Sequence, residues 1–197
     1  MNLKTYLERF KSVIGALTGA LAALPLLSEV LPGKAGDYAF PPLGTYQLFW
    51  VILSVAVAAF VILLVYYFAQ GSSYVAQHDK RVRAFILMGA LELLGVIGYF
   101  VAVQVIVREV SIPTEKKAVA VSVGLERTEF ANRELAGKSD WQMLENMGFH
   151  EEQIRKLWTL KSLLLARTLL FAAYLWVLSI GIGLGSFAVL CDVYDNP

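Results

Sequence analysis

The chain has 197 residues, of which 57% are hydrophobic and 17% charged, and its mean hydropathy is +0.60. A soluble domain is roughly 45–50% apolar and about a quarter charged, so this composition argues against a soluble enzyme. The net charge of +1 argues against direct nucleic-acid binding, and the single cysteine excludes an internal disulfide and a cysteine-based zinc site.

Apolar blocks along the chain predict an α-helical integral membrane protein with four transmembrane helices. About 20 apolar residues in a helix cross the hydrocarbon core of a bilayer. The first block follows a basic start and also fits a cleaved signal peptide, but we expect it to be retained. The expected helices lie at about 13–31, 47–69 and 84–107 within an N-terminal membrane region 1–107, and at 168–190 within a last segment 162–197 that ends in a short acidic tail.

Basic residues beside the apolar blocks predict the orientation of the chain, because they favour the cytoplasmic side of a membrane. Those before the first block, and Lys80, Arg81 and Arg83 after the second, place the N-terminus in the cytoplasm. Basic residues before the last block point the other way. Either residues 108–161 translocate despite their charge, or one block does not cross. We expect a cytoplasmic N-terminus and a membrane-surface basic patch at Lys80, Arg81 and Arg83.

Residues 108–161 form the main polar segment and predict a small α+β domain between helices three and four. Residues 117–125 alternate β-branched and small side chains, which is typical of a half-buried strand. Residues 110–112 repeat the alternation, and 113–116 contain turn-forming residues. The segment therefore predicts a β-hairpin.

Helices should follow the hairpin. Residues 126–136 predict a short helix, and Ser139 with Gln142 has the spacing of a capping box that starts the next. Gly148 suits the left-handed position at the end of that second helix. From Glu151 onward we expect one long, uninterrupted helix that continues into the last transmembrane span.

Met147-Gly148-Phe149 resembles the Met-Gly-Phe loop of ubiquitin-associated domains over one helix and a turn. Those domains need a three-helix bundle, whereas here the third helix is expected to enter the bilayer. We therefore interpret the motif as a glycine-capped helix end and do not carry ubiquitin binding over. The partner-binding surface of the polar domain is expected to include Trp141, Phe149, His150 and Trp158.

The sequence contains no recognisable catalytic or metal-binding constellation. His78 and His150, its two histidines, lie in different loops without ligand spacing. Residues 137–139 imitate the end of a phosphate-binding loop, but Asn132 stands where that motif requires glycine. We therefore expect no catalytic residue, no cofactor, no metal and no enzymatic activity.

Two polar residues lie inside the third apolar block, Glu92 and Gln104. A charged carboxylate near the bilayer centre costs about 2.5–3.5 kcal/mol, so such groups face a bundle interior or an aqueous path. Glu92 is either a pore-lining or proton-coupled group, or a protonated acid that hydrogen-bonds a neighbouring helix. Gln104 is expected to hydrogen-bond between helices.

Small residues in two blocks predict close helix packing. Gly15 and Gly19 form one G-x-x-x-G motif, and Gly181 and Gly185 form another. Such spacing lets helix backbones approach closely, either within one chain or between copies. We expect a homo-oligomer in the lipid bilayer.

In size and in its four-pass layout, the chain resembles the small membrane proteins of bacterial antiviral defence operons, such as the membrane subunit of the Kiwa system. This resemblance implies infection sensing in the bacterial inner membrane with a cytosolic or phage-derived protein partner. We expect an oligomeric membrane sensor or effector, in which recognition by the polar domain opens a pore, disturbs the membrane or signals to a partner. The alternatives are a small-solute channel or transporter and a non-catalytic assembly scaffold.

Overall fold

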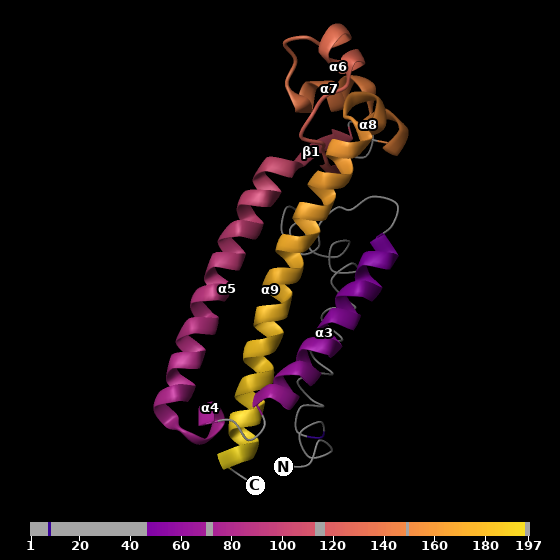
Figure 1. The fold of residues 1–197 in the computed structure, drawn as a ribbon. Coiled ribbons are helices and arrows are strands. Elements are labelled where there is room, and N and C mark those ends of the chain that lie inside the picture. Colours follow the sequence, from indigo (N-terminus) through magenta and orange to yellow (C-terminus); the bar gives the residue numbers. More distant parts are fainter. Residues whose placement is uncertain (1–7, 9–46, 70–72, 113–116, 149, 196–197) are drawn as a thin grey trace. The chain divides into compact units, whose positions relative to one another are not determined.

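The computed structural model describes residues 8, 47–69, 73–112, 117–148 and 150–195. This part of the chain is mostly helical and contains seven helices and one two-stranded sheet (Figure 1). In chain order the elements are α3 (Gln47–Ala69), α4 (Ser73–Ala76), α5 (His78–Ile106), β1 (Val107–Ile112), β2 (Lys117–Ser122), α6 (Glu129–Glu134), α7 (Asp140–Met147), α8 (Glu151–Leu157) and α9 (Leu160–Asp195).

The described elements belong to two compact units. The first, here called the apolar helical unit, contains Val51–Ile97 and Leu175–Pro197. The second, here called the α+β unit, contains Gly98–Tyr174. Helices α5 and α9 are each continuous and contribute residues to both units.

The prediction of four transmembrane helices is wrong for the described chain, where two helices are long and apolar enough to span a membrane. They are His78–Ile106 and Leu160–Asp192. The apolar stretch of α3, Ile52–Phe68, is shorter. Helix α3 as a whole is Gln47–Ala69, which are the bounds predicted for the second apolar helix. The predicted first helix, 13–31, lies outside the described residues.

Long helices α5 and α9 differ from the core helices of soluble proteins in how little of their apolar surface is covered. Only 17% of the most apolar window of α5 and 33% of that of α9 is buried. The side chains of Ile86, Leu94 and Leu169 are 67%, 65% and 49% exposed. Much of the apolar surface of both helices therefore lacks a partner among the described residues.

The predicted β-hairpin is confirmed. Strands β1 and β2 pair antiparallel, with Val107 opposite Ser122 and Val110 opposite Val119. Strand β1 begins directly where α5 ends, at Val107. The end of β2 is tied back to α5, because the Val123 amide donates to the Ile106 carbonyl at 2.8 Å.

Helices α6 and α7 are also confirmed, although α6 is shorter than expected. The Thr128 hydroxyl accepts from the Ala131 amide at 3.2 Å and so caps α6. Ser139 and Gln142 form the predicted capping box at the start of α7. Gly148 has φ +93°, a backbone conformation that favours glycine.

The prediction of one uninterrupted helix from Glu151 is wrong, because the chain leaves helical geometry between α8 and α9. Trp158 is extended, with φ −122° and ψ 146°, and its backbone pairs with Arg127. The Thr159 amide donates to the Glu126 carbonyl at 3.0 Å, and its hydroxyl accepts from the Ser162 amide at 3.3 Å. The chain is extended here because it pairs with Glu126 and Arg127 in the loop after β2. The Thr159 hydroxyl then caps the start of α9.

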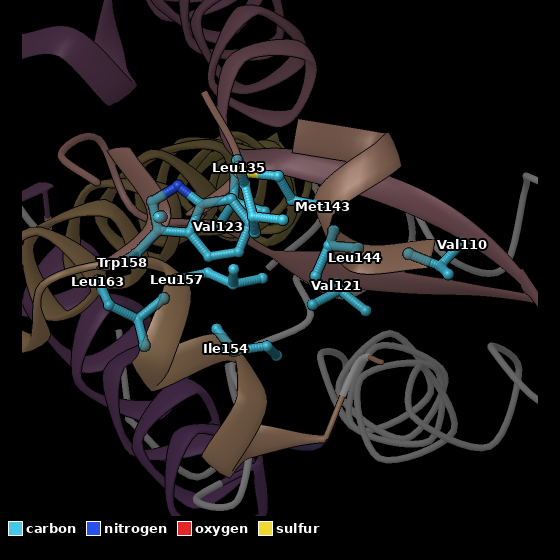
Figure 2. Close-up of a cluster of buried hydrophobic side chains, with 11 residues drawn as sticks. Val110, Val121, Val123, Leu135, Met143, Leu144, Ile154, Leu157, Trp158 and Leu163 are labelled. Carbon is cyan, nitrogen blue, oxygen red and sulfur yellow. The ribbon is translucent and has the colours of Figure 1, made fainter. Parts of the chain in front are cut away.

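A single cluster of buried apolar side chains holds the α+β unit together (Figure 2). Strands β1 and β2, helices α6, α7 and α8, and the first turn of α9 all contribute to it. Trp158, Met143 and Leu144 are among its largest fully buried members. The first turn of α9 is therefore part of the core of this unit.

Candidate functional site

A buried arginine links α9 to the rest of the α+β unit. Arg167 lies two turns into α9 and is 8% exposed. Its Nη1 and Nη2 donate to the two carboxylate oxygens of Glu151 at 2.9 and 2.8 Å, and its Nε donates to the Ser122 hydroxyl at 2.9 Å. We call these three residues the Arg167 clamp, in which each of the three guanidinium nitrogens donates one hydrogen bond.

The secondary structure places each member of the clamp. Ser122 is the last residue of β2, and Glu151 is the first residue of α8. Hydrogen bonding from Arg167 is the main cause that lowers the pKa of Glu151 below its ordinary value, with a smaller contribution from Arg155. Glu151 is therefore held as a carboxylate, which is the form that a bidentate guanidinium requires.

A second charged group joins the hairpin to α7. Asp140, the first residue of α7, accepts from Arg127 Nη2 at 2.8 Å. Arg108 in β1 lies on its other side, with Nη2 at 3.6 Å from Oδ2. A carboxylate at a helix start is also stabilised by the free amides there. Charge pairing thus ties the start of α7 to β1 and to Arg127, and the start of α8 to α9.

The approach of the hairpin to α9 requires a glycine. A Cβ added at Gly124 would lie 2.6 Å from the Ser162 hydroxyl oxygen and 2.7 Å from the Trp158 Cβ. The Ser162 hydroxyl donates to the Glu126 carbonyl at 3.0 Å. The start of α9 is therefore packed and hydrogen-bonded against the loop after β2.

The predicted partner surface is only partly exposed. Trp141 is 45% exposed and His150 is exposed, as the prediction requires. The prediction for Trp158 is wrong, because its side chain is 1% exposed and lies in the core. Phe149 lies outside the described residues. Phe130, which is 43% exposed on α6, was not predicted and is a further exposed aromatic side chain of the α+β unit.

The two predicted intramembrane polar residues have different surroundings. Glu92 lies in the apolar helical unit, where its Oε2 is buried and has no hydrogen-bond partner among the described residues. A Cβ added at Gly181 would lie 3.3 Å from Glu92 Oε1, so Gly181 lets α9 accept this side chain. Gln104 is exposed, and no described interhelical hydrogen bond involves its side chain.

Close packing of α5 and α9 in the apolar helical unit depends on Gly95, which the sequence did not single out. A Cβ at Gly95 would come within 2.4 Å of Trp176 Cδ1. The Trp176 indole donates to the Leu91 carbonyl at 3.4 Å. Gly185, which was predicted to pack, has open space around its Cβ position. Gly15 and Gly19 lie outside the described residues.

The predicted basic patch is partly neutralised. Arg81 donates to the two carboxylate oxygens of Asp195 at 2.6 and 2.9 Å, and it also donates to the Val75 carbonyl. This pairing lowers the pKa of the Asp195 carboxyl. Arg83 is exposed, and Lys80 is partly exposed with its ammonium 6.0 Å from the centroid of the Tyr74 ring.

Among the described residues, no group of three or more histidine, cysteine, aspartate or glutamate side chains could hold a metal ion. Cys191 is free and buried. Compared with known proteins, the chain matches no family model, no curated protein and no solved structure. The Arg167 clamp was not predicted, because Arg167 directly precedes an apolar block and was interpreted as one of its flanking charges.

Proposed function

We propose that this protein is a membrane sensor or effector in which the α+β unit recognises a partner and α5 and α9 carry the response into the bilayer. The observation that carries the proposal is the Arg167 clamp. It ties a helix that is long and apolar enough to span a membrane to the first residue of α8 and the last residue of β2. A shift of the hairpin or of α8 would therefore pull directly on α9.

Placement in a bacterial inner membrane is part of this proposal, with α5 and α9 as the crossing helices. Exposed apolar side chains on both helices support it, because soluble proteins rarely leave such extended apolar surface uncovered. The proposed recognition surface contains the exposed aromatic residues Trp141 and Phe130 and the exposed His150. Aromatic side chains are enriched at protein interfaces, so a protein partner suits this surface.

The role in antiviral defence rested on chain size and a four-pass layout. Because two helices of the described chain have the length and composition of spans, the layout no longer supports that resemblance. We retain the sensor or effector class, with homo-oligomer formation and a cytosolic or phage-derived partner as parts of the proposal. No catalytic step is assigned.

A solute channel is the second candidate, and Glu92 is the observation that favours it. Its unpartnered Oε2 lies within the apolar helical unit, where a carboxyl group is costly unless it meets water, an ion or another polar group. The channel reading predicts that Glu92→Gln changes ion conductance of the reconstituted protein. Equal conductance of wild type and Glu92→Gln would contradict the channel hypothesis.

The sensor proposal is tested by comparing two neighbouring glutamates in cells. Glu151 belongs to the clamp, whereas Glu152 is exposed on the same helix and has no described ion pair. We expect Glu151→Gln to change the membrane potential of expressing cells, measured with a potential-sensitive dye, and Glu152→Gln to match wild type. Identical potentials in all three strains, at equal membrane abundance, would contradict coupling through the clamp.

A further inference from the structure

An apolar cavity opens at one end of the apolar helical unit. It has a volume of about 240 Å³ and is lined almost entirely by apolar atoms. The end of α3 contributes Leu64 and Phe68, and α4 contributes Tyr74. Met88 of α5 and Phe187 of α9 complete it. Four helices therefore line an open apolar hollow that water would not favour.

The basic side chain of Lys80 lies beside this cavity. Lys80 precedes the lining residues Ala84 and Met88 by four and eight positions on α5, so the three share one face of the helix. The Lys80 ammonium also lies 6.0 Å from the centroid of the ring of Tyr74, which lines the cavity. A positive charge and an apolar space are thus about one helical turn apart.

The charges at this end of the unit are mixed, because the last residues of α9 bring Asp192 and Asp195 to it. The first six residues of α5 contain three basic side chains and one acidic side chain, Asp79. Arg81 is engaged by Asp195, and Arg83 is exposed. Lys80 is the basic group whose ammonium lies against a side chain of the cavity, while Arg83 is a nearby exposed charge that does not line it.

We propose that this cavity binds one acyl chain of an anionic membrane phospholipid whose phosphate contacts Lys80. The Lys80 ammonium beside an apolar lining favours that occupant. So does Phe68, a lining residue whose side chain is 78% exposed on a helix surface of apolar residues. The inference rests on the membrane location given in the proposed function. A basic residue near a membrane surface contributes about 1 kcal/mol of attraction to anionic lipid, which is about a fivefold preference.

Lipid binding to the full chain tests the charged end of the site. The purified protein in detergent is titrated with phosphatidylglycerol or phosphatidylcholine of identical acyl chains, and bound lipid is counted by native mass spectrometry. We expect wild type to bind one phosphatidylglycerol about fivefold more tightly than phosphatidylcholine. Lys80→Gln should remove this preference, whereas the control Arg83→Gln should keep it. An equal loss in both variants would indicate diffuse surface charge and overturn the site.

A matched pair on α3 tests the apolar end. Leu64 lines the cavity and is 40% exposed, whereas its neighbour Leu63 is 42% exposed and does not line it. Leu64→Trp should fill the cavity and weaken binding of both lipids several-fold, while Leu63→Trp should bind like wild type. Equal binding by the two tryptophan variants would overturn the proposal, and so would a wild type that binds neither lipid.

Membrane extraction separates this inference from the proposed function. If alkaline carbonate releases the protein from membranes, the proposed function and the lipid site both fail. If the protein stays in membranes but Lys80→Gln and Leu64→Trp behave like their controls, only the lipid site fails.

Discussion

The two units of this protein use their apolar side chains in opposite ways. In the α+β unit, large side chains such as Trp158, Met143 and Leu144 are fully buried in one cluster. In the apolar helical unit, large side chains of α5 such as Leu87 and Leu93 are more than 60% exposed. The first pattern is that of a domain folded in water, and the second is what a surrounding of lipid favours. One overall hydropathy value therefore combines two different environments.

Acidic side chains differ in their surroundings between the two units. The α+β unit contains paired charges, as in the Arg167 clamp and the Arg127–Asp140 pair. Within the apolar helical unit, Glu92 has a buried oxygen without a described partner. The apolar helical unit also has an ion pair at its end, Arg81–Asp195, and the α+β unit has a buried Gln153 Oε1 without a described partner. The difference is that Glu92 is a carboxyl group among apolar helices, where burial without a partner is costly.

The largest expected effect breaks the core of the α+β unit. Trp158→Ala removes a fully buried indole and should lower the free energy of unfolding of this unit by about 3–5 kcal/mol. Hydrogen exchange of α6–α8 peptides in the full chain measures the loss. Trp141→Ala, at a side chain that is 45% exposed, is the control and should change protection little. Equal losses would show that Trp158 is not a core residue.

The second largest loss of stability is expected when the Arg167 clamp is broken. Arg167→Ala leaves the Glu151 carboxylate without its bidentate partner, and breaking such a mostly buried pair costs about 3 kcal/mol. The same exchange experiment should show faster exchange in α8 and at the start of α9. Lys161→Ala, which removes an exposed cation on the same helix, should have almost no effect. A similar exchange rate in both variants would show that the clamp does not stabilise the α+β unit.

The clamp also predicts a dependence on pH. Arg167 lowers the pKa of Glu151 in the folded state, so the stabilisation is present above the unfolded value of about 4.3. It is lost as the pH falls through the lower folded value. The melting temperature of the α+β unit should therefore drop below about pH 4.3, and Glu151→Gln should flatten this drop. An unchanged pH profile in Glu151→Gln would contradict the assignment.

A smaller effect is expected where the hairpin meets α9. Gly124→Ala places a methyl group against Ser162 and Trp158 and should destabilise the α+β unit by about 1–3 kcal/mol. Gly98→Ala is the matched control, since its Cβ position in α5 is open and alanine favours a helix. The melting temperature should therefore fall for Gly124→Ala, and it should stay unchanged or rise for Gly98→Ala.

The smallest effect concerns the cap of α7. Ser139→Ala removes the hydroxyl that accepts from the Gln142 amide and should cost about 1 kcal/mol. Ser139→Thr keeps an acceptor and should stay close to wild type. Exchange of the first α7 amides measures both, and a larger loss in the threonine variant would argue against the cap.

Local chemistry made part of the fold predictable from the sequence. The alternating residues of 117–125 and the turn at 113–116 predicted the hairpin, which is confirmed by the pairing of β1 and β2. Ser139, Gln142 and Gly148 predicted both ends of α7. These signals act over four or five residues, so no knowledge of the rest of the chain was needed.

Contacts between distant residues were not predictable in this way. Arg167 meets Ser122 from 45 positions away, and the extended geometry of Trp158 depends on pairing with Arg127. Thr159 offered one local signal, because threonine is a common helix cap, but the helix appeared uninterrupted without a glycine or proline. By contrast, the apolar run at 47–69 did predict the bounds of α3, because that signal lies within the run itself.

The most direct test of the account asks whether α9 crosses a membrane with the α+β unit at its N-terminal side. Cys191 is buried, so it is replaced by serine, and one cysteine is introduced at exposed Lys138 or exposed Asp192. An impermeant thiol reagent is then applied to intact cells and to opened vesicles. If α9 spans the membrane, one position labels in intact cells and the other labels only after the vesicles are opened. Labelling of both positions from the same side would contradict a membrane-spanning α9.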